Sequence, residues 1–142
     1  MYEPIRGKSV HTMAAEGSDV PRRSREAELE FQLAGHLAAL LALTDELRSQ
    51  APCEDLDEAA EQLAQQVARL RGGVLPARAA LPVTAREDDP QTRVAALHHR
   101  AHDLAGRALV VAASRADTRA AILAAQRMEA HAEALARPLS PC

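Results

Sequence analysis

The chain has 142 residues, the length of a single domain, and 47% of them are hydrophobic, enough to form a core and to exclude wholesale disorder. It contains one Phe, one Tyr and no Trp, so the aromatic residues that favour β-strands are almost absent, while alanine, the best helix former, is abundant. A net charge of −3 argues against a general nucleic-acid-binding surface, which needs clustered basic residues. The composition predicts an all-α protein, and its bias toward Ala, Arg and Leu is typical of a GC-rich bacterial genome.

Residues 1–23 mix charged residues with Gly and Pro, and no helical or strand period lasts long enough to define an element. They are predicted to form a flexible N-terminal arm, and their scattered apolar residues leave open that the arm docks on a groove. Ser24 is a candidate N-cap, and the glutamates after it place negative charge in the first helical turns, where the helix dipole favours it. The first helix is predicted over residues 24–50, ending before Pro52.

This first helix is apolar over most of its circumference, because between Phe31 and Leu43 only Gln32 and His36 are polar. It must be covered on most sides, either by helices of its own chain or by a second copy of the protein. Gly35 is expected to permit a close backbone approach. The two apolar stripes are Leu29, Leu33, Leu37, Leu40, Thr44 and Leu47, and Phe31, Ala34, Ala38, Leu41 and Ala42. The run is shorter than the roughly 20 residues that a bilayer requires.

A second helix is predicted over residues 55–71, with Asp55 and Glu58 as a capping box and Gly72-Gly73 as a left-handed stop. Its apolar stripe consists of Leu56, Ala59, Ala60, Leu63, Val67 and Leu70. The connector that follows contains two prolines and is long for a loop between bundle helices. It is therefore expected to wrap across the bundle or to become ordered on a partner.

A proline at the first helical position predicts a third helix over residues 90–114, and Asp117 is a candidate N-cap for a fourth helix over residues 117–136. The alternative is one uninterrupted helix from Pro90 to Arg137. The third stripe is Val94, Leu97, Ala101, Leu104, Ala105, Ala108, Val111 and Ala112, and the fourth is Ala121, Ile122, Ala125, Met128, Ala132 and Leu135.

Four amphipathic segments on one chain predict a four-helix antiparallel bundle over residues 24–137, followed by a short tail of residues 138–142. No internal repeat indicates a solenoid.

The densest group of polar residues contains His98 and His102, which share a helix face at a spacing of four residues. His36 and His131 lie at the borders of their own apolar stripes, so a bundle could bring all four imidazoles to one divalent transition metal. The other interpretation is that these histidines are half-buried, hydrogen-bonded boundary residues. The sequence lacks the zincin motif and the paired Glu-x-x-His motif of di-iron bundles. The cluster could also sense pH, since two imidazolium ions one turn apart repel each other.

No pattern indicates catalysis. The chain has no glycine-rich phosphate loop and no nucleophile elbow, and Cys53 is interpreted as an ordinary cysteine near a helix start. Cys53 and Cys142 do not suggest a disulfide framework. A small arginine patch before the first helix is followed at once by glutamates, so nucleic-acid binding is not expected. We expect neither enzymatic activity nor a cofactor.

The sequence therefore predicts a non-enzymatic interaction or regulatory protein that associates with itself, as a homodimer or larger homo-oligomer, or with another protein. The expected interface is the second stripe of the first helix: Phe31, Ala34, Ala38, Leu41 and Ala42. The alternative is a helical bundle that binds a metal or a small ligand through His98 and His102. A second alternative is a transcription-associated protein. Since no signal peptide is evident in the first 30 residues, a cytoplasmic location is expected.

Overall fold

The computed structural model describes residues 19–78 and 89–138, with side chains from residue 24 onward. Within these ranges the chain forms helices and no strand, and the predicted all-α four-helix bundle is confirmed. The helices are α2 (Asp19–Gln50), α3 (Glu54–Leu70), α4 (Pro90–Ser114) and α5 (Thr118–Ala136). Most of the predicted N-terminal arm, the second half of the connector and most of the tail lie outside the described residues.

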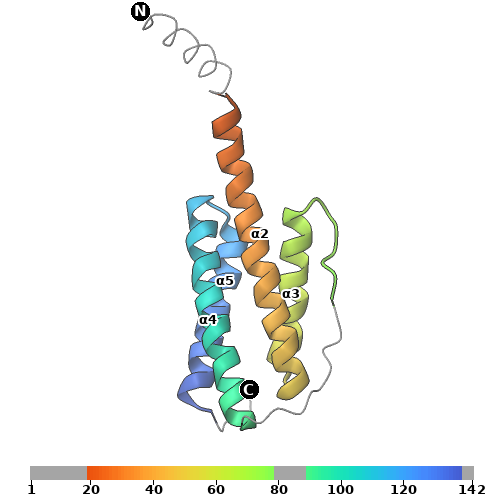
Figure 1. The fold of residues 1–142 in the computed structure, drawn as a ribbon, viewed down its shortest axis with the longest axis vertical. Helices are drawn as coiled ribbons and strands as arrows, with labels where there is room; N and C mark the ends of the chain where they lie inside the picture. The colour runs from red at the N-terminus through yellow and green to blue at the C-terminus, as the bar shows by residue number, and fades with distance from the viewer. Residues whose placement is uncertain (1–18, 79–88, 139–142) are drawn as a thin grey trace, which may run out of the picture.

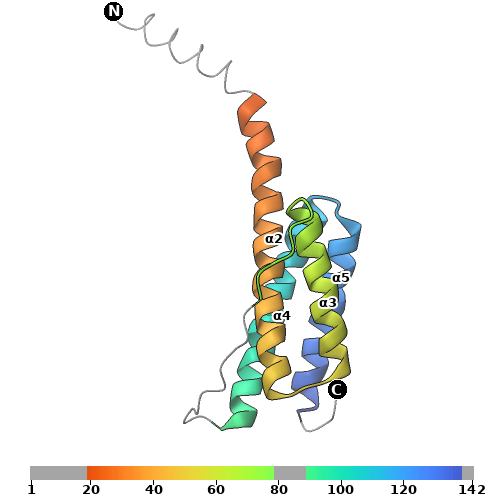
Figure 2. The ribbon, with the colours of Figure 1, turned by 90° about the vertical axis from the view of Figure 1, so that its right-hand side faces the viewer.

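The bundle places α2 between α3 and α4, and α5 against α4 (Figure 1). The helix contacts are most extensive between α4 and α5 and sparsest between α3 and α5. Each helix runs antiparallel to its neighbours, and α3 ends at the opposite end of the bundle from the start of α4 (Figures 1 and 2). The two ends of the connector therefore lie at opposite ends of the bundle. Its described part returns along α2, where Arg78 Nη2 lies 2.7 Å from Asp45 Oδ1.

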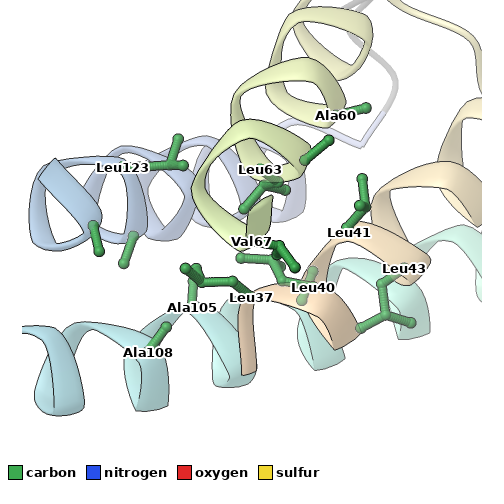
Figure 3. Packing of buried hydrophobic residues seen from close by; sticks show 14 of the residues in the cluster. Leu37, Leu40, Leu41, Leu43, Ala60, Leu63, Val67, Ala105, Ala108 and Leu123 are labelled. Carbon is green, nitrogen blue, oxygen red and sulfur yellow. The ribbon is translucent and has the colours of Figure 1, made fainter. Parts of the chain in front are cut away.

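The main stripe of α2 forms the centre of the core, as predicted. Leu33, Leu37, Leu40, Thr44 and Leu47 are all fully buried. In Figure 3, Leu63 and Val67 of α3 lie close to Leu37 and Leu40 of α2. The one hydroxyl in this stripe is satisfied locally, because Thr44 Oγ1 donates to the carbonyl oxygen of Leu40 at 2.8 Å.

Alanines make up much of the buried surface of α4 and α5. Ala101, Ala105, Ala108 and Ala112 of α4 and Ala120 and Ala124 of α5 are all fully buried. Small side chains let two helices approach closely and gain dispersion contacts that offset the small apolar area each alanine contributes. At Gly106 a Cβ atom would lie 3.6 Å from Met128 Cε, so the two helices also fit closely there.

The turn between α4 and α5 rules out the single long helix. Ala116 takes a left-handed conformation with φ of 57°, and the carboxylate of Asp117 accepts a hydrogen bond from the Ala120 amide at 3.2 Å. The same carboxylate accepts two hydrogen bonds of 2.9 Å from Arg69 Nη2 of α3. Asp117 is thus an N-cap, as predicted, and it also ties α5 to α3 at this end of the bundle.

Two of the predicted helix starts are wrong. α2 begins at Asp19, so Ser24 lies inside the helix rather than at its cap; Pro21 stands in the first turn, where proline is tolerated. α3 begins at Glu54, with Cys53 at the N-cap position and no side-chain capping hydrogen bond, so Asp55 is not the cap.

The predicted end of α3 is confirmed. Gly72 and Gly73 have φ of 72° and 94°, and the Gly73 amide donates to the Ala68 carbonyl at 2.6 Å, a bond of the kind that closes helices at a left-handed glycine. In the described part of the chain, no helix is long and apolar enough to span a membrane.

Candidate functional site

α5 buries a different face from the one its apolar residues predict. Of the predicted stripe, Ala121 and Met128 pack against the core, but Ile122 is 53% exposed and Ala132 is exposed, so the prediction is only partly correct. The buried residues are Ala120, Leu123, Ala124, Arg127 and His131. The physical reason is the alanine surface of α4: Ala120 and Ala124 fit it closely, whereas a branched Ile122 in the same place would hold the helices apart. This orientation turns Arg127 and His131 into the bundle.

Arg127 is a buried cation with a half-exposed partner. Its side chain is 5% exposed, and its Nη1 donates to Asp55 Oδ2 at 3.1 Å. The Asp55 side chain, at the start of α3, is 50% exposed. Within the described part of the chain, Arg127 Nε is buried and has no hydrogen-bond partner. Asp55, which the sequence suggested as a capping residue, instead reaches across to α5.

His131 is paired directly with His98 of α4. The two Nδ1 atoms are 2.9 Å apart, and the rings are tilted by 50° with centroids 5.1 Å apart. One ring must donate and the other accept, which requires that at least one of them be neutral. The second ring nitrogen of His131, Nε2, is buried and has no partner among the described residues.

Burial and nearby positive charge keep both imidazoles neutral at neutral pH. Burial, followed by the charges of Arg127, His98 and His102, lowers the pKa of His131 to about 3. Burial, followed by Arg127 and His99, also lowers the pKa of His98. A neutral pair is what an N–H···N hydrogen bond between the rings needs.

These side chains line a cavity of about 970 Å³ at one end of the bundle. Its walls come from the α2–α3 turn, the first turns of α4 and the last turns of α5, which meet at the lower end of Figure 1. Much of the lining is apolar, including Leu56, Val94, Ala95, Ala130, Ala134 and Leu135. Asp55, His98, Arg127 and His131 supply polar groups.

The predicted four-histidine metal site is not assembled. Of His36, His98, His102 and His131, the structure joins only His98 and His131 by a direct contact. His36 lies on α2, where burial and the charge of Arg107 lower its pKa. Among the described residues, no group of three or more His, Cys, Asp or Glu side chains is arranged to hold a metal ion. The paired Nδ1 atoms are used in a hydrogen bond with each other rather than left as free ligands.

The predicted interface stripe of α2 lies partly inside the chain's own core. Ala34 and Leu41 are 2% and 3% exposed, and Ala38 packs against the core. Phe31 and Ala42 remain exposed, and Phe31 is 73% exposed. The stripe is divided because α3 and α4 cover one of its flanks. The close approach expected at Gly35 is wrong, since no atom lies within 4 Å of a Cβ placed there.

Cys53, which also lines the cavity, is disulfide-bonded, contrary to the expectation that the cysteines form no framework. The sulfur therefore offers no thiolate to the cavity in this state. The other cysteine of the sequence, Cys142, lies outside the described residues.

No protein-family model, curated protein or solved structure matches this chain.

Proposed function

We propose that this protein is a non-enzymatic helical bundle that binds a small molecule in the cavity at the end of α5. The observation that carries the proposal is Arg127: a buried guanidinium that lines the cavity and has a hydrogen-bond donor with no acceptor among the described residues. Leaving a buried donor unsatisfied costs about 1–3 kcal/mol, and more for a charged group. A bound ligand with an acceptor atom would offset that cost.

The size and lining of the cavity support the same function. Ligand pockets typically enclose roughly 300–1,000 Å³ and combine apolar walls with a few placed polar groups. This cavity, at about 970 Å³, falls within that range and has both kinds of lining. Four of its polar groups are held by two contacts between different helices: Arg127 to Asp55 of α3, and His131 to His98 of α4. Such groups are positioned before a ligand arrives, which lowers the entropic cost of binding.

The proposal predicts that a neutral apolar dye, N-phenyl-1-naphthylamine, gains fluorescence on the full-length protein in non-reducing buffer. Ala134→Phe places a larger side chain in the cavity wall and is expected to weaken dye binding by about tenfold or more, since it fills space the dye needs. Ala132→Phe is the matched control, because Ala132 is exposed on the same helix and is not part of the wall. Equal dye affinity in both variants, or no dye binding by the wild type, would reject the proposal.

A second candidate function, association through α2, is supported by the exposed Phe31. The N-terminal part of α2 extends beyond the ends of the other helices (Figures 1 and 2), and residues 24–28 are exposed. A short helical segment without packing is only marginally stable in water, so contact with a second copy would stabilise it. Sedimentation velocity at micromolar concentration is then expected to show a dimer that Phe31→Ser dissociates. A monomeric wild type would exclude this function.

A further inference from the structure

We propose that the ligand of the cavity is an organic acid whose carboxylate takes the place of Asp55 on Arg127. This inference rests on the proposed function, since it names the chemical class of the molecule that the cavity binds.

The two partners of the Arg127–Asp55 ion pair are unequally buried. Arg127 is held inside the bundle at 5% exposure, whereas the Asp55 side chain is 50% exposed. The Asp55 carboxylate can therefore be hydrated when it turns outward, whereas Arg127 stays buried and then needs another anion to balance its charge. The arginine is the fixed half of the pair, and the carboxylate is the replaceable half.

Asp55 leaves one hydrogen-bond donor of the Arg127 guanidinium unused. A guanidinium presents its N–H groups as a planar fork, and a carboxylate that accepts two parallel hydrogen bonds from it is bound more strongly than one that accepts a single bond. Asp55 accepts from Nη1 at 3.1 Å, while Nε has no partner in the described part of the chain. Because Nε is closed to solvent, a ligand carboxylate can engage the side of the fork that includes Nε only after Asp55 has turned outward.

The other charged groups of the cavity wall do not balance the charge of Arg127. Glu133 and Arg137 form a pair at 3.2 Å in which both side chains are largely exposed, and His98 and His131 are neutral at neutral pH. When Asp55 turns outward, the buried charge of Arg127 has no partner, which favours an anion over a neutral or cationic ligand.

His131 offers a second contact. It lies four residues after Arg127 on the same face of α5, and its Nε2 is buried with no partner in residues 19–78 and 89–138. If His98 donates through Nδ1, His131 carries its proton on Nε2 and can donate to an acid bound at Arg127. The rest of the wall is largely apolar, which suits a hydrocarbon tail rather than inorganic phosphate.

Isothermal titration of the full-length protein in non-reducing buffer with hexanoate, hexanamide and inorganic phosphate tests the inference. The two organic probes share a tail and differ in charge. Hexanoate is expected to bind about tenfold or more tightly than hexanamide, and phosphate is expected not to displace it. Arg127→Gln should reduce hexanoate affinity to that of hexanamide, while Arg119→Gln, which removes an exposed arginine elsewhere on α5, should not.

Asp55→Asn keeps the test decisive if Arg127→Gln fails to fold. It removes the competing carboxylate, so hexanoate affinity is expected to rise severalfold. Equal binding of hexanoate and hexanamide, displacement of hexanoate by phosphate, or a fall in affinity in Asp55→Asn would overturn the inference while leaving the proposed function intact. Failure of the neutral dye to bind would remove the proposed function itself.

Discussion

Replacing Leu41 with glutamate is expected to unfold the protein rather than to separate two copies of it. Leu41 is 3% exposed and belongs to the core cluster to which α2, α3, α4 and α5 all contribute. The substitution removes a leucine from this core, at a cost of about 2–5 kcal/mol, and adds the cost of an unpaired buried charge. The sum is comparable with the whole stability of a typical domain, about 5–15 kcal/mol. Far-ultraviolet circular dichroism should show loss of helix or a greatly lowered melting temperature.

Ala42→Glu is the matched control for this experiment, because Ala42 is the next residue and is exposed. Its effect on the free energy of unfolding is expected to stay within about 0.5 kcal/mol, as for an ordinary surface substitution. If Leu41→Glu instead keeps full stability and only changes the sedimentation coefficient, Leu41 lies between copies of the protein and its place in the intramolecular core is wrong.

Acidification from neutral pH is expected to lower the free energy of unfolding, mainly through His131. Its pKa is about 3 in the folded protein, where burial, Arg127 of the same helix and His98 and His102 of α4 oppose its protonation. In the unfolded chain its pKa is about 6.5. Between these values the unfolded chain binds a proton that the folded protein excludes, so stability is complete above about pH 6.5 and falls by up to about 1.4 kcal/mol per pH unit below it.

Urea denaturation at several pH values between about 7 and 4.5, a range in which the carboxylates contribute little, measures this slope. His98 adds to it in the same direction, since burial lowers its pKa as well. The slope should become shallower in His131→Gln and change much less in His99→Gln, because His99 is exposed and its charge is the smallest of the three causes that lower the pKa of His98. An equally steep slope in His131→Gln would show that His131 is not the buried neutral group.

The fold of α2, α3 and α4 could be predicted because their buried residues are almost all apolar. The spacing of Leu33, Leu37 and Leu40 marks the buried face of α2, and it is the face the structure buries. The break at Asp117 was predictable for a different reason, since a carboxylate that caps a helix start acts through its own local chemistry and needs no information about the rest of the fold.

The candidate site could be predicted only in part. The sequence identified His98 and His131 as polar residues at the edges of their helices, but it did not identify Arg127, because an arginine in an amphipathic helix is ordinarily a solvent-exposed residue. The available signal was the row of positions from Ala120 and Ala124 through Arg127 to His131, which share one helix face. The alanines on this face, rather than the larger Ile122, fit the alanine surface of α4.

The contact of Asp55 with Arg127 could not be predicted from the sequence for a similar reason. Its spacing from Glu58 is typical of a capping box, and only the position of α5 in three dimensions shows that its carboxylate contacts Arg127 instead. Local patterns therefore give the correct helices, while the cross-helix pairs that build the cavity wall depend on how α3, α4 and α5 are rotated about their axes.

The most direct test of the binding account is the proton–nitrogen correlation spectrum of the arginine Nε groups, recorded with and without hexanoate. The Arg127 signal, assigned by its disappearance in Arg127→Gln, is expected to move downfield as its Nε–H gains a carboxylate acceptor, and to stay in place with hexanamide. The signal of exposed Arg119 should not move with either compound. An Arg127 signal that is unchanged at high hexanoate concentration would contradict the account.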